Sequence, residues 1–197
     1  MVSDYRCFFC FTRAFEKLVE KENISNEAKN CFIRDMINLY QNNWDKFTAP
    51  EFSRELHGIL RSYTLNPDPY KRVKKENNDQ ALRMFPELEN IIRQSKDPFD
   101  TALRLSIAGN IIDFAANDNF DLQATINKAL NSEFAIDHSK QLKEAIKNAK
   151  TVLYLGDNAG EIVFDKLLIE TINHPDLIFV VRGAPVINDA TIEDAEY

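Results

Sequence analysis

Two short apolar runs in the last quarter of the chain constrain its fold more than any other feature. The runs TVLYL (151–155) and LIFVV (177–181) are rich in β-branched and aromatic residues, and glycine follows shortly after each. This composition is typical of buried strands. Between them, residues 161–173 carry apolar side chains at helical spacing. The sequence therefore predicts a strand, a helix and a second strand parallel to the first.

Residues 1–148 have a different pattern, which predicts helices. Apolar residues recur there every three or four positions, and the whole chain has only five glycines. We expect six or seven helices, including one over 100–116 and one over 137–150. The polar segment 66–80 is expected to be a surface connection or a binding loop. Five prolines should mark the joints between helices: Pro50, Pro67, Pro69, Pro86 and Pro98.

The predicted fold class is α/β, with a helical domain over 1–148 and the start of a Rossmann-like parallel α/β domain over 149–197. Residues 191–196 are typical of the first turn of another helix. Two parallel strands do not form a self-sufficient sheet. We therefore expect the second domain to be incomplete in this chain; the alternative is that the helices cover a naturally small sheet.

The charge and hydropathy of the chain disfavour two classes of partner. The 24 Lys and Arg residues face 31 Asp and Glu, a net charge of −7, which leaves no broad basic surface for nucleic acid or anionic lipid. The longest apolar runs are far shorter than the roughly 20 residues needed to cross a bilayer. The first residues lack a secretory pattern and the three cysteines suggest reduced thiols, so we expect a cytoplasmic protein.

Polar residues follow both predicted strands, at the edge where open α/β sheets bind ligands. The loop GDNAGE (156–161) supplies Asp157 and Asn158, and the loop RGAPVIND (182–189) supplies Asp189. Because the ends of parallel strands meet at one edge, these oxygens could converge on one ion, and an all-oxygen set suits Mg²⁺ or Mn²⁺. The alternative is that the two aspartates cap helices.

The first of these loops also leads directly into the predicted helix. Gly160 and Glu161 stand at that helix start, where backbone N–H groups attract anions. We expect these two N–H groups to help bind a group such as phosphate. The loop matches neither of the common glycine-rich nucleotide motifs.

The segment GNIID (109–113) places a glycine inside a predicted helix, where it costs about 1 kcal/mol relative to alanine. Asn110 and Asp113 are three residues apart and share a helix face, so they are candidates for a ligand cleft. Since ligand sites favour domain junctions, this helix is predicted to face the first loop. The alternative is a polar face with Gly109 at a close crossing of two helices.

Cys7 and Cys10 form a CxxC pair near the start of the chain. A structural zinc site needs about four ligands, and the three histidines are scattered along the sequence. A redox-active pair normally follows a strand, and none is predicted here. We expect instead two thiols on the buried side of a first helix.

Five segments together resemble the damage-control phosphatase family, also known as domain of unknown function 89. The resemblance implies a helical N-terminal region and a Rossmann-like domain that hydrolyses phosphomonoesters with a divalent metal. The cysteine pair is similar to the prokaryotic branch, and family members are longer than this chain. The five segments are CFFC (7–10), NPDPYKRVKKENNDQAL (66–82), AGNIIDFA (108–115), LGDNAGEIVFDKLLIE (155–170) and VRGAPVINDAT (181–191).

The resemblance also implies roles for individual residues. Asp157, Asn158 and Asp189 would hold the metal, which would be Mn, Mg, Co or Ni. Asn110 and Asp113 would line the substrate cleft. Asp157 would be the catalytic residue, as metal ligand, general base or nucleophile, and the substrate would be a small phosphorylated metabolite such as a sugar phosphate or phosphopantetheine.

Two other functions remain as alternatives. A carboxyl methyltransferase that uses S-adenosylmethionine needs a ribose-binding acid after the second strand, where this chain has Arg182 and Gly183. A non-enzymatic helical interaction module would not bind a divalent metal tightly. The sequence leaves the oligomeric state open.

Overall fold

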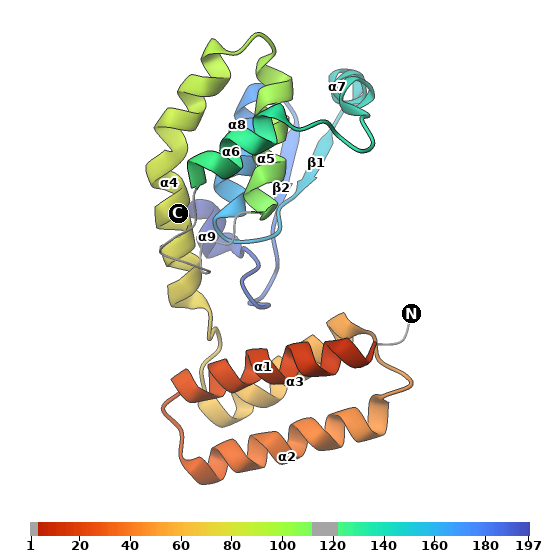
Figure 1. The fold of residues 1–197 in the computed structure, drawn as a ribbon, viewed down its shortest axis with the longest axis vertical. Helices are drawn as coiled ribbons and strands as arrows, with labels where there is room; N and C mark the ends of the chain where they lie inside the picture. Colours follow the sequence, from red (N-terminus) through yellow and green to blue (C-terminus); the bar gives the residue numbers. More distant parts are fainter. Residues whose placement is uncertain (1–3, 112–121) are drawn as a thin grey trace. The chain divides into compact units, whose positions relative to one another are not determined.

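The computed structural model describes residues 4–111 and 122–197, which belong to two compact units (Figure 1). The first unit is Met1–Pro69 and the second is Tyr70–Tyr197. The change of sequence pattern at 148/149 thus falls inside the second unit. Helices that precede this point share a core with the elements that follow it, because the helix Glu161–Ile172 packs directly on those earlier helices.

The first unit consists of three helices. They are α1 (Tyr5–Lys21), α2 (Asn26–Asn43) and α3 (Ala49–Thr64). Each begins at a residue suited to capping, since Asp4 and Ser25 accept backbone N–H groups and Thr48 forms a capping box. Their interior is aromatic: Tyr40 stacks on Phe52 with ring centroids 4.4 Å apart. These aromatic side chains form the hydrophobic core of the first unit.

The cysteine pair lies on α1 but not on its buried face. The buried residues of that helix are Phe15, Leu18 and Val19, whereas Cys7 is half-buried and Cys10 is exposed. The expectation of two buried thiols is therefore wrong for Cys10. The cause is helical periodicity, because the core-facing stripe of α1 passes beside that position.

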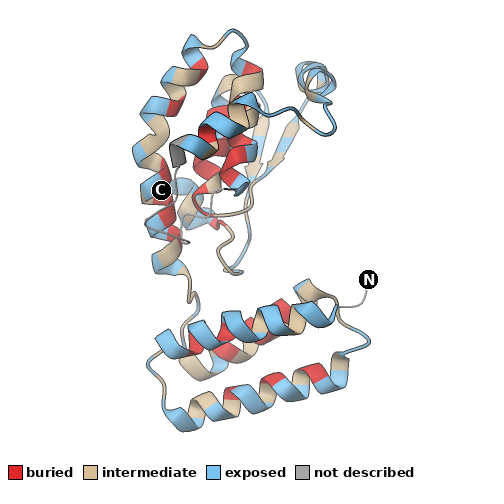
Figure 2. Cartoon of the chain, viewed as in Figure 1, coloured by how far each residue is buried: buried red, intermediate tan, exposed pale blue. Residues whose placement is uncertain are grey.

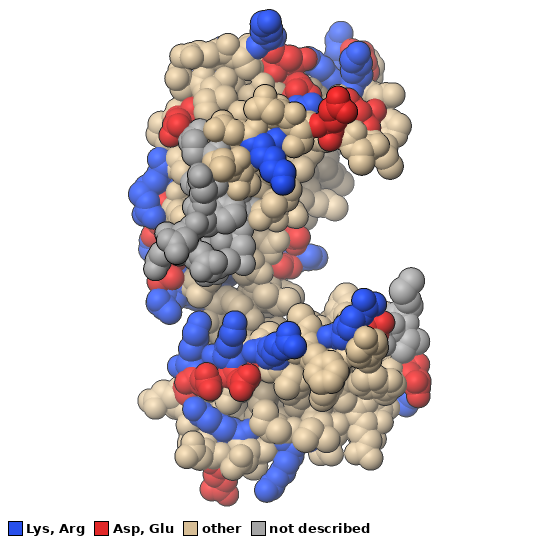
Figure 3. All heavy atoms as spheres, viewed as in Figure 1, with Lys and Arg blue, Asp and Glu red and all other residues tan. Residues whose placement is uncertain are grey.

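Basic side chains accompany Cys10 on the surface of α1. Arg6, Arg13 and Lys17 line an open depression together with Phe9 and Cys10. Figure 3 shows blue side chains grouped along this helix on the viewed face. A net charge of −7 for the chain thus coexists with a local basic surface.

The second unit is a mostly helical α/β structure with a small parallel sheet, which confirms the predicted fold class. Strands β1 and β2 pair in parallel with Val152 opposite Leu177. Its elements are α4 (Lys71–Gln94), α5 (Pro98–Ile111), α6 (Leu122–Asn131), α7 (Ser139–Asn148), β1 (Val152–Leu155), α8 (Glu161–Ile172), β2 (Leu177–Val180) and α9 (Ile192–Glu196).

Helix α8 lies at the centre of the second unit. It is apolar on most of its surface, and Figure 2 shows the buried residues of this unit concentrated on α8 and the helices beside it. Its closest neighbour is α5. A Cβ at Gly109 of α5 would lie 2.9 Å from the Cβ of Phe164. Gly109 therefore sits at a close helix crossing, as the packing alternative for this glycine predicts.

Replacing Gly109 by alanine is expected to lower the free energy of unfolding by about 1–3 kcal/mol, because the added methyl group would overlap Phe164 at this crossing. The intrinsic helix preference of alanine offsets only part of this cost. Gly58 of α3 is the matched control, since a Cβ there meets nothing within 4 Å. Gly58→Ala should stabilise by about 0.5–1 kcal/mol. Chemical denaturation followed by circular dichroism measures both changes, and equal stabilisation by both variants would contradict the close crossing.

The two strands are buried on one face only, which corrects the expectation of fully buried strands. Val152, Tyr154 and Phe179 are partly buried, whereas Leu153 is 62% and Leu155 is 73% exposed. Burial alternates along both strands because successive side chains point to opposite faces of a sheet. In the described residues, helices cover one of those faces.

Helix α4 overturns two further expectations. Residues 71–80 of the supposed connection are helical, and Pro86 lies inside this helix rather than at a joint. Buried residues before and after the proline, Ala81 and Leu88, belong to the same core cluster. Tertiary packing along the whole length of α4 therefore outweighs the backbone hydrogen bond that Pro86 removes.

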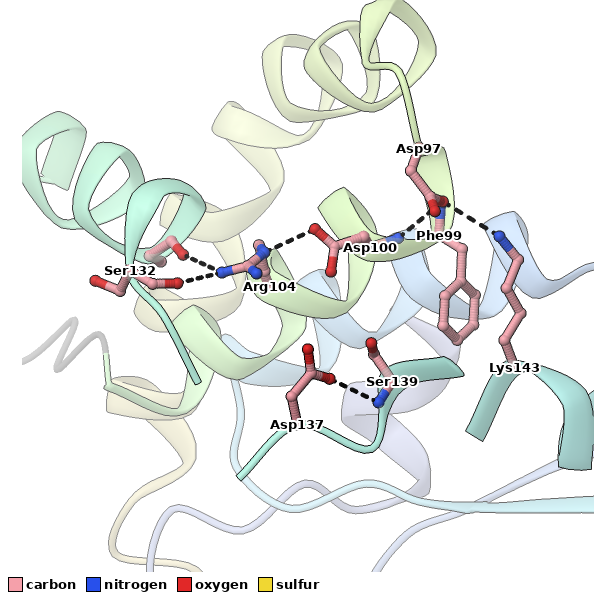
Figure 4. Close-up of polar contacts among 9 residues, drawn as sticks. Asp97, Phe99, Asp100, Arg104, Ser132, Asp137, Ser139 and Lys143 are labelled. Atoms are coloured by element: carbon pink, nitrogen blue, oxygen red, sulfur yellow. Dashed lines mark hydrogen bonds and ion pairs between the residues drawn. The ribbon is translucent and has the colours of Figure 1, made fainter. Parts of the chain in front are cut away.

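Charged residues link α5 and the residue before it to α7 and to the segment after α6 (Figure 4). Asp97 accepts the N–H of Asp100 at 3.3 Å and also binds Lys143 of α7 at 3.3 Å. Arg104 donates to Asp100 at 2.7 Å and to the carbonyl of Ser132 after α6. These contacts connect α5 to α7 and to the segment after α6.

Within the described part of the chain, no helix has the length and apolar character needed to cross a membrane.

Candidate functional site

The loops that follow β1 and β2 lie against each other at the carboxyl edge of the sheet. The N–H of Ala159 donates to the carbonyl of Asn188 at 2.9 Å, and the N–H of Ala190 donates to the carbonyl of Asp157. Asn158 and Asp189 form an isolated bridge between the loops. The structure thus brings together Asp157, Asn158 and Asp189, the three residues that the sequence places at this edge.

Arg182 joins the two aspartates. Its Nε donates to Asp189 Oδ2 at 2.7 Å, and its Nη2 lies 3.4 Å from Asp157 Oδ1. Burial raises the pKa of Asp189, and the hydrogen bond from Arg182 counteracts part of that rise. Both carboxylates therefore lie close to one positive charge, the guanidinium of Arg182. The sequence signal for Arg182 was a basic residue directly after a strand, at the same edge as two acids.

Neither aspartate caps a helix, which removes the alternative explanation for them. The N-cap of α8 is Gly160, and no side chain caps it. The N-cap of α9 is Thr191, which forms a capping box with Asp194. The side chains of Asp157 and Asp189 are instead directed at Arg182.

Glu161, the first residue of α8, connects the first loop to α5. Asn110 Nδ2 donates to Glu161 Oε1 at 3.0 Å and to Oε2 at 3.1 Å. Asn158 Nδ2 lies 3.3 Å from Glu161 Oε2 and 3.3 Å from Asp157 Oδ2. Helix α5 therefore faces the first loop through Asn110, as expected. Asp113, its predicted partner on this face, lies outside the described residues.

The N–H of Gly160 is not directed at a ligand, contrary to its predicted role. It donates to Oδ1 of Asn78 in α4 at 2.6 Å. Gly160 is buried and has φ of 87°, a conformation that favours glycine. The loop turns inward here because the backbone N–H finds a buried acceptor.

An open cavity of about 480 Å³ adjoins Glu161. Its volume is that of sites for small metabolites. Residues of α5, β1 and α8 line it: Ser106, Ile107, Asn110, Ile111, Leu153, Tyr154, Leu155, Glu161 and Asp165.

Asp165 is a buried acid in the wall of this cavity that the sequence reasoning missed. Its Oδ1 accepts hydrogen bonds from Ser106 and Tyr154, both at 2.7 Å. Burial raises the pKa of Asp165 to about 6, the two hydrogen bonds oppose the rise, and the charges of Glu161 and Asp157 add to it. The available signal was an acid in an otherwise apolar helix, one turn after Glu161.

The donor chemistry of the two loops fits a hard divalent cation. Asp157 and Asp189 supply carboxylate oxygens and Asn158 an amide oxygen, the ligand types that Mg²⁺ and Mn²⁺ prefer. The side chain of Asp157 is 48% exposed and that of Asp189 is 13% exposed, so one carboxylate opens to solvent. Among the described residues, no three or more His, Cys, Asp or Glu side chains are grouped to hold a metal.

The chain matches a known protein family over nearly its whole length. The model of the damage-control phosphatase ARMT1-like domain matches residues 3–197. The chain belongs to the damage-control phosphatase ARMT1-like family. This confirms the resemblance carried by the five sequence segments, while the branch suggested by Cys7 and Cys10 stays a prediction.

Proteins from three organisms resemble the chain. It is 30% identical to a damage-control phosphatase of Pyrococcus horikoshii, over 98% of this chain and 68% of that protein. It is 40% identical to a damage-control phosphatase of Archaeoglobus fulgidus, over 65% of this chain and 46% of the relative. An uncharacterised protein of Methanocaldococcus jannaschii is 33% identical, over 96% of this chain and 65% of its own length.

A solved structure of the ARMT1-like family shares the fold. The crystal structure of a DUF89 family protein from Pyrococcus horikoshii matches all of this chain and 70% of its own, with a TM-score of 0.78 and 29% identity. The chain thus spans about two thirds or less of the length of the curated relatives.

Proposed function

We propose that the protein is a metal-dependent phosphatase that hydrolyses small phosphomonoesters at the edge formed by the loops after β1 and β2. The observation that carries the proposal is the convergence of Asp157, Asn158 and Asp189 at the carboxyl end of the sheet, next to Glu161, which lines a cavity of about 480 Å³. Membership in the damage-control phosphatase ARMT1-like family and the names of two relatives support the same activity.

In this proposal the two loops hold a divalent cation through Asp157, Asn158 and Asp189. The preferred ions are Mg²⁺ and Mn²⁺, with Co²⁺ and Ni²⁺ as further candidates. The ion supplies polarisation of the phosphoryl oxygens and neutralises charge that develops on them. Asp157 is the proposed catalytic residue, and its partly exposed side chain fits the role of ligand, general base or nucleophile.

The other residues of the site would bind and orient the substrate. Asn110 and Glu161 lie next to Asn158 and Asp157. Asp113, which lies outside the described residues, is proposed as a substrate-binding residue from the family pattern alone. The N–H of Glu161 at the start of α8 favours a phosphate oxygen, as helix N-termini do. Since Gly160 donates its N–H to Asn78, we assign it the turn of the loop rather than a phosphate contact.

The proposed substrate class comes from the family resemblance, and the size of the cavity is compatible with it. The cavity accommodates a small phosphorylated metabolite, such as a sugar phosphate or phosphopantetheine. A net charge of −7 disfavours nucleic acid and anionic membranes as partners. A methyltransferase site is also disfavoured, because Arg182 occupies the end of β2 and is bonded to Asp189, where a ribose-binding acid would be needed.

The test is a screen of the full-length protein against a panel of phosphomonoesters with Mn²⁺, Co²⁺, Ni²⁺ or Mg²⁺. We expect phosphate release that requires one of these ions and stops when a chelator removes it. The proposal would be contradicted if the folded protein hydrolysed none of these phosphomonoesters with any of the ions.

The double variant Cys7→Ser with Cys10→Ser is the control for the kind of metal site. Hard cations bind oxygen donors, and thiols are poor partners for them. Turnover of this variant should therefore stay within a few fold of the unmodified protein. Loss of activity together with release of one equivalent of zinc would show that the thiols hold the essential metal instead.

A further inference from the structure

Two polar residues of α4 are buried although they lie in one of the most polar segments of the chain. Lys74 is 3% and Asn78 is 2% exposed. They are four residues apart and share a face of the helix. Lysine and asparagine are seldom buried to this extent without polar partners, because desolvation is costly. Their partners therefore indicate why the segment is helical.

The partners of Asn78 are the first site loop and α9. Its Oδ1 accepts the N–H of Gly160 at 2.6 Å, and its Nδ2 donates to Asp194 Oδ1 at 3.2 Å. Gly160 stands two residues after Asn158. The side-chain amide of Asn78 thus accepts a hydrogen bond from the first loop and donates one to α9, which follows the second loop.

Lys74 binds the same carboxylate from the other side. Its Nζ donates to Asp194 Oδ2 at 3.0 Å, in an ion pair whose side chains are 3% and 9% exposed. Asp194 Oδ2 also accepts the N–H of Thr191 at 2.9 Å and its hydroxyl at 2.8 Å. The carboxylate of Asp194 therefore fixes the backbone at Thr191.

Thr191 is continuous with the second site loop. The N–H of its neighbour Ala190 donates to the carbonyl of Asp157, and Asp189 precedes that residue. Arg182 pairs with Thr191 through a backbone bridge. Hydrogen bonds thus connect Asn78 to Gly160 in one loop, and through Asp194 and Thr191 to the other loop.

We infer that Lys74 and Asn78 are positioning residues that hold the two loops in the register needed for Asp157, Asn158 and Asp189 to act on one ion. This inference rests on the proposed function for the role of those three residues. Neither Lys74 nor Asn78 lines the cavity beside Glu161. They act through Gly160 and Asp194.

The inference predicts a metal-binding defect in a folded protein. Asn78→Ala leaves the Gly160 N–H without its acceptor and frees the first loop from α9. We expect the dissociation constant for Mn²⁺, measured by isothermal titration calorimetry on the full-length protein, to rise at least about tenfold, which corresponds to roughly 1.4 kcal/mol. With Mn²⁺ saturating, kcat should recover toward that of the unmodified protein more than it does at low Mn²⁺.

Two control variants separate positioning from stability. Lys71→Met removes an exposed ion pair between the same two helices, with Glu193 of α9, and should leave Mn²⁺ affinity unchanged. Leu88→Ala destabilises α4 through the core cluster and should also leave Mn²⁺ affinity unchanged while the protein is folded. An affinity for Mn²⁺ that falls equally in Leu88→Ala and Asn78→Ala would overturn the inference.

Hydrogen exchange tests the same inference without any activity. In Asn78→Ala the amides of Ala159, Gly160 and Ala190 should exchange faster, whereas those in the middle of α8 should not. If Asn78→Ala fails to fold, the double variant Lys74→Met with Asp194→Asn removes both buried charges but keeps the bond from Gly160 to Asn78. Faster exchange is then expected at Ala190, which precedes Thr191, and unchanged exchange at Gly160. Unchanged exchange at Ala190 in the folded variant would overturn the inference. Unmodified protein that binds no Mn²⁺ would refute the proposed function, and the exchange result would still decide whether α4 orders the loops.

Discussion

Replacing Asp157 by alanine is expected to lower phosphatase turnover of the full-length protein by at least about 10²–10³-fold, because it removes a charged group from the reacting centre of the proposed site. The side chain is 48% exposed, and among the described residues it forms an ion pair with Arg182 at 3.4 Å. A partly exposed loop carboxylate contributes little to folding. The melting temperature should therefore change little while turnover is lost.

Asp176 is the matched control for Asp157. It is also an exposed aspartate, but it lies in the turn before β2, at the amino end of the sheet, where it accepts a hydrogen bond from Thr151. Asp176→Ala should keep turnover within a few fold. Steady-state kinetics and thermal melting of both variants provide the measurement. Equal turnover in the two variants would remove Asp157 from the reaction.

The strand–helix–strand unit could be predicted because each of its elements carries its own pattern. The runs 151–155 and 177–181 contain the observed strands, and residues 161–173 contain α8. Parallel pairing follows from the connecting helix. The meeting of Asp157 with Asp189 could be predicted for the same reason, since the ends of parallel strands share one edge.

The contribution of α4 could not be predicted, because its partners are distant in the sequence. The segment 66–80 is polar and contains two prolines, which indicates a loop by local criteria. Its Lys74 is buried next to Asp194, 120 residues later, which supplies the opposite charge. Composition identifies a polar segment but not the buried partner that turns it into part of a core.

The burial of Asp165 in α8 could not be predicted either, for the same reason. Local pattern places it among apolar residues, and its two hydroxyl partners come from α5 and β1. The buried face of α8 therefore contains an acid whose ionisation costs free energy in the folded state. That cost has a measurable consequence for stability.

Replacing Asp165 by alanine is expected to lower the free energy of unfolding by about 2–5 kcal/mol, because the hydroxyls of Ser106 and Tyr154 lose their shared acceptor inside the protein. Asp165→Asn keeps an oxygen at the same position and should cost much less at neutral pH. Urea denaturation at pH 7 measures both changes. A loss of equal size in the two variants would contradict the role of the hydrogen bonds.

The pH dependence of Asp165→Asn isolates the charge itself. The pKa of Asp165 is raised from 3.8 to about 6 in the folded protein, chiefly by burial. A raised pKa means that the folded state binds the proton more tightly, so this contribution to stability is complete below about pH 4 and is lost as the pH rises through about 6. The unmodified protein should lose up to about 3 kcal/mol from this group between pH 4 and pH 7. Asparagine does not titrate, so the stability of Asp165→Asn relative to the unmodified protein should rise by that amount over the same range. Parallel stability curves for the two proteins would mean that Asp165 is already ionised at no cost, and that burial does not control its charge.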